Sequence, residues 1–444
     1  MIIKRVDIHN FRGFEHLEAK FHPQMTVVIG NNTAGKTTLL QAVQVGLGAF
    51  LQSLSDLPTG KAYRKNFAQT DQFLRYSLEK RDFFPNNENT RLDIVADFVT
   101  TKQNANGNWD FPLEEITWYR ELQKGHTSHT RQCAGQLIDK VREMELERKT
   151  PNSNAVFPLV LSFGTNRIDA QYRTAKKTKE RLTRVAKAYK SALQQEVDFQ
   201  GALEWLKRYR QLIKDGKEFE GTWSAFFEAL QTAIPALSEI TFVDNEIEAY
   251  VTVYGRQPER HTYTYMSDGL KAMINIVSEI AHRCIELNGF LGTDAIKKTP
   301  GVVVIDEIDL YLHPRWQRHV LRDLQNAFPK IQFIVSTHSP FIVQSLESNQ
   351  LISFDDAVNV SGEPFREGLE DIAEERMGLK QDIRSKRFNE MVEKATQLFN
   401  AVDQQSTNAD ELKKQLDILE AEYSDDPAYL AMVRMEYQSK LDKR

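Results

Sequence analysis

The feature that most constrains this 444-residue chain is one stretch near its start, "MTVVIGNNTAGKTTLLQAV". An apolar run typical of a buried strand leads into a turn that matches G-x-x-x-x-G-K-[ST], and an apolar helical pattern follows. Together they predict a phosphate-binding loop, in which backbone amides and a helix N-terminus face an anion. Lys36 would reach the β- and γ-phosphates. We expect nucleotide contacts from Gly30, Asn31, Asn32, Thr33, Ala34, Gly35, Lys36, Thr37 and Thr38.

A second buried strand, in "VVVIDEID", ends in the acidic pair Asp306–Glu307. Taken with the phosphate loop, it predicts that Asp306 and Thr37 hold Mg²⁺, while Glu307 orients or deprotonates the attacking water. A core strand that ends in solvated acids is the structural alternative. A third buried strand, "IQFIVSTHS", leads to His338, which is either structural or senses the γ-phosphate. The pattern favours hydrolysis of ATP with Mg²⁺, and its predicted catalytic residues are Glu307, His338 and Lys36.

Bulk composition narrows the choice of partner and compartment. A net charge of −5 is too small to imply a nucleic-acid or membrane partner, so any basic surface must be local. Two cysteines, Cys133 and Cys284, are too few for a disulfide framework or a Cys-based zinc site. The first residues lack the features of a signal peptide, and no run approaches the roughly 18 apolar residues that span a bilayer. We expect a cytoplasmic protein without a membrane partner.

Hydrophobic periodicity predicts an α/β fold with an antiparallel N-terminal lobe, a parallel sheet, a helical insertion and a helical C-terminal tail. "NEIEAYVTVYG" and "TYTYM" predict a strand pair, and an apolar stripe of helical spacing begins after Gly269. The parallel strands should carry the phosphate loop, Asp306–Glu307 and His338 at their carboxyl ends. The expected parts are 1–165 with an irregular insertion at about 52–90, a helical insertion or lid at 166–240, a second part of the head at 241–345, and the tail at 346–444.

Two further segments give these motifs a family resemblance. "MSDGLK" is similar to the signature motif of the ABC-type ATPase heads of the SMC and recombination-repair class, and "NFRGF" resembles their N-terminal motif. The resemblance implies an ABC/SMC-type P-loop head in which Ser267, Asp268 and Gly269 of one subunit close over ATP held by another. ATP would then join a homodimer or a higher even-numbered oligomer. The resemblance also makes Arg12 a phosphate or nucleotide contact.

The motifs as a set, over most of residues 1–345, resemble the PtuA-like ATPases of bacterial anti-phage defence. "LSFGTNR", "DEIDLYLHPRWQR" and "STHSPFIVQS" carry this resemblance together with the motifs above. It implies a Septu or retron ATPase that regulates an associated HNH nuclease subunit (PtuB-like), with nucleic acid, including a retron RNA or DNA, as a further partner. The tail is the expected docking site for the nuclease.

Two other functions compete with this interpretation. One is a standalone DNA-repair or chromosome-associated SMC-like ATPase, whose tail would pack on its own head. The other is a nuclease within this chain, but no Toprim-like arrangement of Glu and Asp-x-Asp follows "STHSP", and Asp355 and Asp356 are isolated.

The sequence also departs from the family pattern and contains weaker candidates. Met266 replaces the usual leucine of the signature, the glutamine loop has only Gln69 and Gln72 as candidates by order, and His313 is a candidate member of the D-loop. His126, His129 and Cys133 have zinc-like spacing without a fourth ligand. A basic stretch predicts either a solvated helix or a nucleic-acid groove. Its members are Arg173, Lys176, Lys177, Lys179, Arg181, Arg184, Lys187 and Lys190.

Overall fold

The structure is a computed structural model of the chain in which two compact units divide at residue 372, giving 1–372 and 373–444. It describes residues 1–78, 81–85, 88–99, 102–103, 109–110, 112–123, 134–150, 155–167, 182–195, 199–218, 220–252, 256–354, 362–379, 386–403, 411, 414, 416–418, 421 and 427–442.

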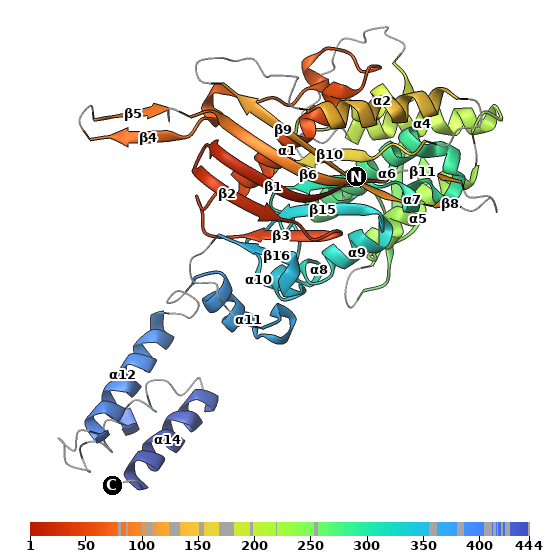
Figure 1. Ribbon diagram of the computed structural model, residues 1–444. Helices are drawn as coiled ribbons and strands as arrows, with labels where there is room; N and C mark the ends of the chain where they lie inside the picture. The colour runs from red at the N-terminus through yellow and green to blue at the C-terminus, as the bar shows by residue number, and fades with distance from the viewer. Residues whose placement is uncertain are drawn as a thin grey trace. The chain divides into compact units, whose positions relative to one another are not determined.

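A five-stranded parallel sheet in the order β10-β14-β15-β3-β16 forms the centre of the first unit (Figure 1). Its strands are β3 (Met25–Ile29), β10 (Leu159–Phe163), β14 (Gly301–Ile305), β15 (Ile331–Ser336) and β16 (Leu351–Ser353). The first four are buried at every position, as in a parallel sheet covered on both faces. The predicted parallel sheet is therefore confirmed.

The antiparallel lobe is a four-stranded sheet in the order β2-β1-β6-β9. Its strands are β1 (Ile2–Phe11), β2 (Phe14–Lys20), β6 (Thr90–Val99) and β9 (Leu113–Leu122). Along β6, buried and half-buried residues alternate strictly, so one face of this sheet packs on the core and the other faces outward. A two-stranded ladder pairs β7 (Lys102–Gln103) with β8 (Trp109–Asp110). The predicted antiparallel lobe is confirmed.

The segment expected to be irregular, at about 52–90, contains more regular structure than predicted. It holds the 3-10 helices η1 (Lys61–Tyr63) and η2 (Gln69–Asp71), and a hairpin of β4 (Leu74–Ser77) and β5 (Asp82–Pro85). The hairpin projects from the sheets in Figure 1. Cross-strand contact between the rings of Tyr76 and Phe83, 5.1 Å apart, supports a strand pair that polar composition does not predict.

Helix α1 (Lys36–Ser53) contacts strands of both sheets, β14 and β15 on one side and β6 and β9 on the other. The apolar stripe predicted for this helix, including Leu39, Leu40 and Leu47, is fully buried there. The Trp118 indole donates a hydrogen bond of 3.1 Å to the Gly46 carbonyl and fixes α1 to the lobe. Helix α2 (Gly135–Lys149) covers α1 and β9. The helix that follows the phosphate loop is thus held from both sides.

Helix α6 (Asp268–Asn288) packs against the helical insertion, represented by α3 (Arg184–Tyr189), α4 (Phe199–Lys214) and α5 (Glu220–Ala233). Every residue from Gly269 to Asn288 except Lys271 is buried, although the sequence pattern predicted one apolar stripe. A three-stranded sheet of β11 (Leu237–Val243), β12 (Glu246–Val251) and β13 (Glu259–Thr262) precedes it. The strand predicted for "TYTYM" is wrong beyond Thr262, because Tyr263–Tyr265 form the 3-10 turn η4 into α6.

Short helices complete the first unit. They are η5 (Gly289–Asp294), α7 (Ala295–Lys298), α8 (Pro314–Gln317), α9 (Val320–Ala327), α10 (Pro340–Val343), η6 (Ser348–Gln350), η7 (Pro364–Arg366) and α11 (Leu369–Asp371). The π-helix η8 (Ile372–Arg376) lies at the boundary between the two units.

The second unit contains α12 (Lys386–Asp403) and α14 (Pro427–Asp442), so its described part is helical, as expected for the tail. Apolar residues of the tail could pack within this chain or on a partner. Leu416 and Val433 are buried, and Met432 is exposed. Leu412, Leu419 and the Tyr429 side chain lie outside the described part. The tail has a small core of its own, formed by Met391, Ala395, Leu398, Leu416, Leu430, Val433 and Tyr437. Among the described residues, no helix is long and apolar enough to cross a membrane.

Candidate nucleotide-binding site

The carboxyl ends of four parallel strands bring the predicted motifs to one edge of the sheet. The phosphate loop follows β3, Asp306 and Glu307 follow β14, and His338 comes soon after β15. A fourth segment, Gly164–Arg167, follows β10 at the same edge. Ligands of open α/β sheets bind outside this edge.

The phosphate loop has the backbone that its glycines predict. Gly30 and Gly35 have φ values of 151° and 107°, and Thr33 has a φ of 74°. A Cβ on Gly35 would lie 2.4 Å from the Phe14 ring, so a side chain there would displace the ring that covers the loop. The Lys36 ammonium donates to the carbonyl oxygens of Gly30, at 2.6 Å, and Asn31, at 3.1 Å. The cation is thereby held against the loop itself.

Asn31, Asn32 and Thr33 are exposed, and Ala34 and Thr38 are half-buried. The Ala34 N–H closes a tight turn by donating to the Asn31 carbonyl over 3.1 Å. All nine predicted contact residues therefore belong to one turn and the first residues of α1.

The Asp306 carboxylate is the point where two strands and α1 meet. It is 7% exposed and accepts hydrogen bonds from the Thr37 hydroxyl, at 3.1 and 3.4 Å, and from the Ser336 hydroxyl, at 2.5 Å. Oxygen donors from a carboxylate and a hydroxyl beside a phosphate loop suit Mg²⁺. Thr37 and Asp306 thus fit the predicted metal, and Ser336 is an addition that the sequence pattern did not reveal.

Glu307 stands in an unusual backbone conformation. Its φ is 51°, in the left-handed region that costs energy for a residue other than glycine. Its N–H donates to the Ser336 hydroxyl over 2.8 Å. Ser336 therefore contacts both acidic residues and fixes their relative position.

Arg167 is a second residue that the sequence motifs did not single out, although it is the last residue of "LSFGTNR". It is 1% exposed, and its guanidinium donates to the carbonyl oxygens of Gly164, Asp306 and Glu307. Burial lowers the pKa of Arg167 to about 10, against the opposing effect of nearby carboxylates led by that of Asp309. The side chain therefore remains a cation at neutral pH and supports the backbone beneath the acidic pair.

A chain of hydrogen bonds links Arg167 to helix α6. The Asn275 amide donates to the Arg167 carbonyl over 2.8 Å, and the Tyr263 hydroxyl donates to the Asn275 side-chain oxygen over 2.8 Å. The start of α6 also touches the loop after Glu307, since a Cβ on Gly269 would lie 2.6 Å from the Tyr311 carbonyl oxygen. The signature segment and the acidic pair of one chain are thus in continuous contact.

His338 is exposed at the end of β15, and its backbone is held by Asp309. Asp309 accepts a hydrogen bond of 2.6 Å from Thr337 and one of 3.4 Å from the His338 N–H. The backbone at His338 is therefore held by Asp309, three residues after Asp306.

Ser267 and Asp268 are exposed at the N-terminus of α6. Ser267 lines a pocket of about 590 Å³ together with Tyr265, Leu270, His313 and Trp316. Among the described residues that line this pocket, none belongs to the phosphate loop. His313, the D-loop candidate, caps helix α8 by accepting from the Arg315 N–H.

Arg12 has its guanidinium on Asp71, with Nε to Oδ1 at 2.6 Å, and a φ of 51°. It stands in the turn between β1 and β2, two residues from Phe14, whose ring contacts the phosphate loop. The two candidates for the glutamine loop lie near this turn. Gln72 pairs with Phe11 in an isolated antiparallel β-bridge, and Gln69 is the first residue of η2.

Several weaker candidates lie outside the described residues: His126, His129, Cys133, Asp355, Asp356, and the basic residues Arg173, Lys176, Lys177, Lys179 and Arg181. Of the remaining basic residues, Lys187 and Lys190 are exposed, while Arg184 pairs with Glu218 at 3.1 Å and with Glu286 at 3.7 Å. Arg184 is therefore engaged with the helical insertion and with α6.

A protein-family model described as "AAA domain, putative AbiEii toxin, Type IV TA system" matches residues 25–344. The "Retron Vc95 probable ATPase" of Vibrio cholerae serotype O1 biovar El Tor is 23% identical over 399 residues, covering 79% of this chain and 72% of that protein. The "Septu protein PtuA" of Bacillus mycoides (strain KBAB4) is 42% identical over 81 residues, covering 18% of this chain and 11% of that protein. These similarities confirm the resemblance to retron and Septu ATPases.

Among solved structures, an SMC head bound to the C-winged helix domain of ScpA is similar at 16% identity, with a TM-score of 0.46. The similarity covers 80% of this chain and 94% of that chain.

Proposed function

The chain is an ATPase that belongs to the family described as "AAA domain, putative AbiEii toxin, Type IV TA system", and we propose that the phosphate loop, Asp306 and Glu307 bind and hydrolyse its ATP. The observation that carries this proposal is the convergence of Thr37 and Ser336 on the buried Asp306 carboxylate, next to a loop that holds Lys36. Lys36 neutralises the terminal phosphates, and Glu307 orients or deprotonates the attacking water.

Thr37 and Asp306 are the residues that would hold Mg²⁺, which supplies positive charge against the phosphate oxygens when bound. His338 lies at the same edge and contacts the γ-phosphate in this proposal. Glu307→Gln should lower the steady-state ATPase rate by about 100-fold or more, because it removes the general base while ATP binding is retained. Phosphate release and equilibrium nucleotide binding, measured on the same preparation, test this; an unchanged rate would remove Glu307 from the mechanism.

The signature segment acts on ATP bound by a second copy of the chain in this proposal. Ser267 and Asp268 are exposed, and the pocket at Ser267 has no described lining residue from the phosphate loop of its own chain. An exposed signature favours action in trans, with ATP as the group that joins two heads. The γ-phosphate would then bias an equilibrium between separate and joined heads.

Size measurements with ATP test the trans arrangement. The Glu307→Gln variant should accumulate an ATP-bound dimer, and adding Ser267→Arg should return it to the nucleotide-free size because the arginine obstructs the joined heads. Asn349→Arg is the matched control, since Asn349 is also exposed and does not line the pocket at Ser267. The same assembly for all three variants would exclude signature-driven dimerisation while leaving ATP hydrolysis intact.

We further propose that the ATPase regulates an HNH nuclease subunit in a bacterial anti-phage system of Septu or retron type. The similarity to the Vibrio cholerae retron ATPase over most of the chain supports this context. A tagged copy expressed with its native genomic neighbours should co-purify with a stoichiometric HNH protein. Recovery of the chain alone, with ATPase activity stimulated by DNA, would instead favour the standalone repair ATPase.

A further inference from the structure

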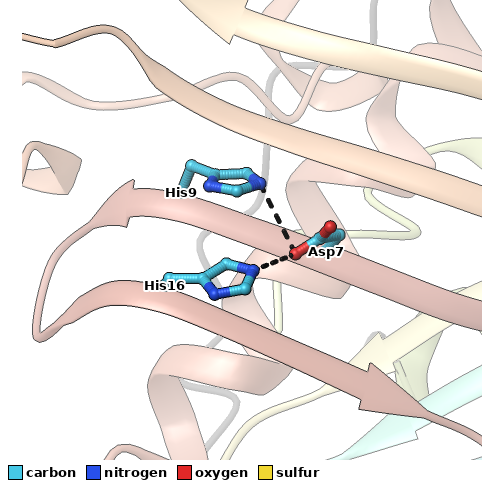
Figure 2. Close-up of side chains that lie close together, drawn as sticks. All are labelled: Asp7, His9 and His16. Atoms are coloured by element: carbon cyan, nitrogen blue, oxygen red, sulfur yellow. Dashed lines mark hydrogen bonds and ion pairs between the residues drawn. The ribbon is translucent and has the colours of Figure 1, made fainter.

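Asp7, His9 and His16 form a cluster on the outward face of the antiparallel lobe (Figure 2). The Asp7 Oδ1 atom lies 2.8 Å from His16 Nε2 and 3.5 Å from His9 Nε2. One potential ligand atom from each residue lies within 4.8 Å of the other two. Both imidazoles thus present a nitrogen to the same carboxylate oxygen.

Strand register explains why these three side chains meet. His9 on β1 lies directly opposite His16 on β2, and Asp7 precedes His9 by two positions on the same strand. Side chains two apart on a strand share a face, and directly paired residues are neighbours across the ladder. Ile8, between Asp7 and His9, is completely buried on the other face. The arrangement is therefore fixed by the backbone of the sheet.

The two imidazole rings are stacked, with centroids 4.6 Å apart and an angle of 17° between their planes. In a tetrahedral zinc site, bonds of about 2.0–2.1 Å from nitrogen and carboxylate oxygen separate neighbouring ligand atoms by about 3.3 Å. The observed separations of 2.8 and 3.5 Å bracket that value. Two of the three separations thus suit one ion, and the imidazoles would have to rotate out of their stacked arrangement to aim both ring nitrogens at it.

We propose that Asp7, His9 and His16 bind a divalent transition-metal ion, with Zn²⁺ as the type example. Two imidazoles and one carboxylate favour such an ion over Mg²⁺, which prefers oxygen ligands. This site is distinct from Thr37 and Asp306, and it does not depend on the proposed ATPase mechanism.

The neighbouring charges leave these three ligands available. Glu18, opposite Asp7 on β2, pairs with Arg5 at 3.3 Å, and Asp93, opposite Asp7 on β6, pairs with Arg91 at 2.5 Å. The exposed fractions of the Asp7, His9 and His16 side chains are 27%, 41% and 59%. Water therefore reaches the cluster and supplies the fourth ligand, as in zinc sites with three protein ligands.

The ion would join β1 to β2 next to their connecting turn, which carries Arg12 and Phe14. Because metal binds the folded arrangement and rarely an unfolded one, binding should raise the melting temperature. Metal occupancy would in this way stabilise the hairpin whose Phe14 ring covers Gly35.

Titration of the full chain, freed of any histidine tag and of bound metal, tests the proposal. Excess Mg²⁺ is kept in the buffer so that it occupies the proposed magnesium site at Thr37 and Asp306. Co²⁺ should bind with one strong equivalent per chain, give the visible absorption bands of tetrahedral coordination, and be displaced by Zn²⁺ in a calorimeter. His16→Gln and His9→Gln should each weaken binding by more than about 100-fold, since loss of outer-shell partners alone costs about 10- to 100-fold.

His261→Gln is the matched control, because His261 is also a partly exposed histidine next to a carboxylate, 3.7 Å from Glu259. It should bind Co²⁺ like the parent. Zn²⁺ should raise the melting temperature of the parent and of His261→Gln but not of His16→Gln, and without metal all three should melt together. Binding that is weak, exceeds one equivalent, or survives in His16→Gln would overturn the proposal.

Discussion

Arg167 shows how a single buried side chain can position the proposed catalytic residues through their backbone carbonyls. Its donors contact the carbonyl oxygens of Asp306 and Glu307. Arg167→Lys keeps the charge but removes the planar set of donors. We expect it to lower the ATPase rate by about 10- to 100-fold, because a misplacement of about 1 Å at reacting groups costs up to about 100-fold. Initial rates at saturating ATP, measured below the melting transition, provide the test.

Arg120 offers a matched control for that variant. Like Arg167, it is a buried arginine whose pKa is lowered to about 10 by burial, and it donates to the carbonyl oxygens of Val45 and Lys65. Arg120→Lys should lose comparable stability, since each carbonyl left unpaired costs about 1–3 kcal/mol, while its turnover stays near that of the parent. Equal losses of turnover in the two variants would mean that Arg167 acts only through stability.

The phosphate loop and the acidic pair could be predicted because strand, turn and polar residues are adjacent in the sequence. Arg167 could not, because its acceptors on Asp306 and Glu307 are 139 and 140 residues away and reach it through the parallel pairing of β10 with β14. The Asp7, His9 and His16 cluster had a local signal, namely two histidines on either side of "NFRGFE". Only the register of β1 with β2 shows that they meet.

At the scale of secondary-structure elements, the start of α6 and the loop after β14 are packed backbone against backbone at Gly269. Gly269→Ala would place a Cβ 2.6 Å from the Tyr311 carbonyl oxygen, so one element must shift. We expect a loss of about 1–3 kcal/mol of stability, as for other overpacked sites, together with slower ATP hydrolysis. Chemical denaturation and steady-state rates measure the two effects.

Gly135→Ala controls for the loss of glycine at a helix start, because Gly135 is the first residue of α2 and an added Cβ there meets nothing within 4 Å. It should leave both stability and turnover close to those of the parent. If Gly269→Ala behaves in the same way, the contact between α6 and the Tyr311 loop does not couple the signature segment to the acidic pair Asp306–Glu307.

The helical character of α6 was predictable from its apolar spacing, but its burial on nearly every side was not. That burial comes from β10, α7 and η5 together with α3, α4 and α5, which pack on α6 from an insertion whose placement the spacing within α6 does not encode. The local pattern was also misleading at Tyr263–Tyr265. Polar and aromatic residues alternate there as in a strand, but these residues form a 3-10 turn that leads into α6.

At the scale of the whole molecule, the α/β class could be predicted from three patterns in the sequence. Buried parallel strands appear as continuous apolar runs, antiparallel strands as alternation, and helices as apolar residues at helical spacing. A separate buried cluster within the tail could not be predicted, since its polar helices fit either packing on the head or docking of a partner. The structure gives the tail a buried cluster drawn from residues 391–437 alone. The tail helices therefore bury apolar side chains against one another, and docking of a partner on them stays a proposal.

A chain that ends at Leu379 separates these interpretations, because it retains the π-helix Ile372–Arg376 and removes the whole tail cluster. We expect its head to melt within a few degrees of the parent and to bind ATP with unchanged affinity, since the removed cluster includes no residue of the first unit. Co-purification with the proposed HNH nuclease should be lost. A large fall in the melting temperature would show that the tail completes the head, as the standalone repair ATPase requires. A stable head that still retains the nuclease would place the docking surface within residues 1–379.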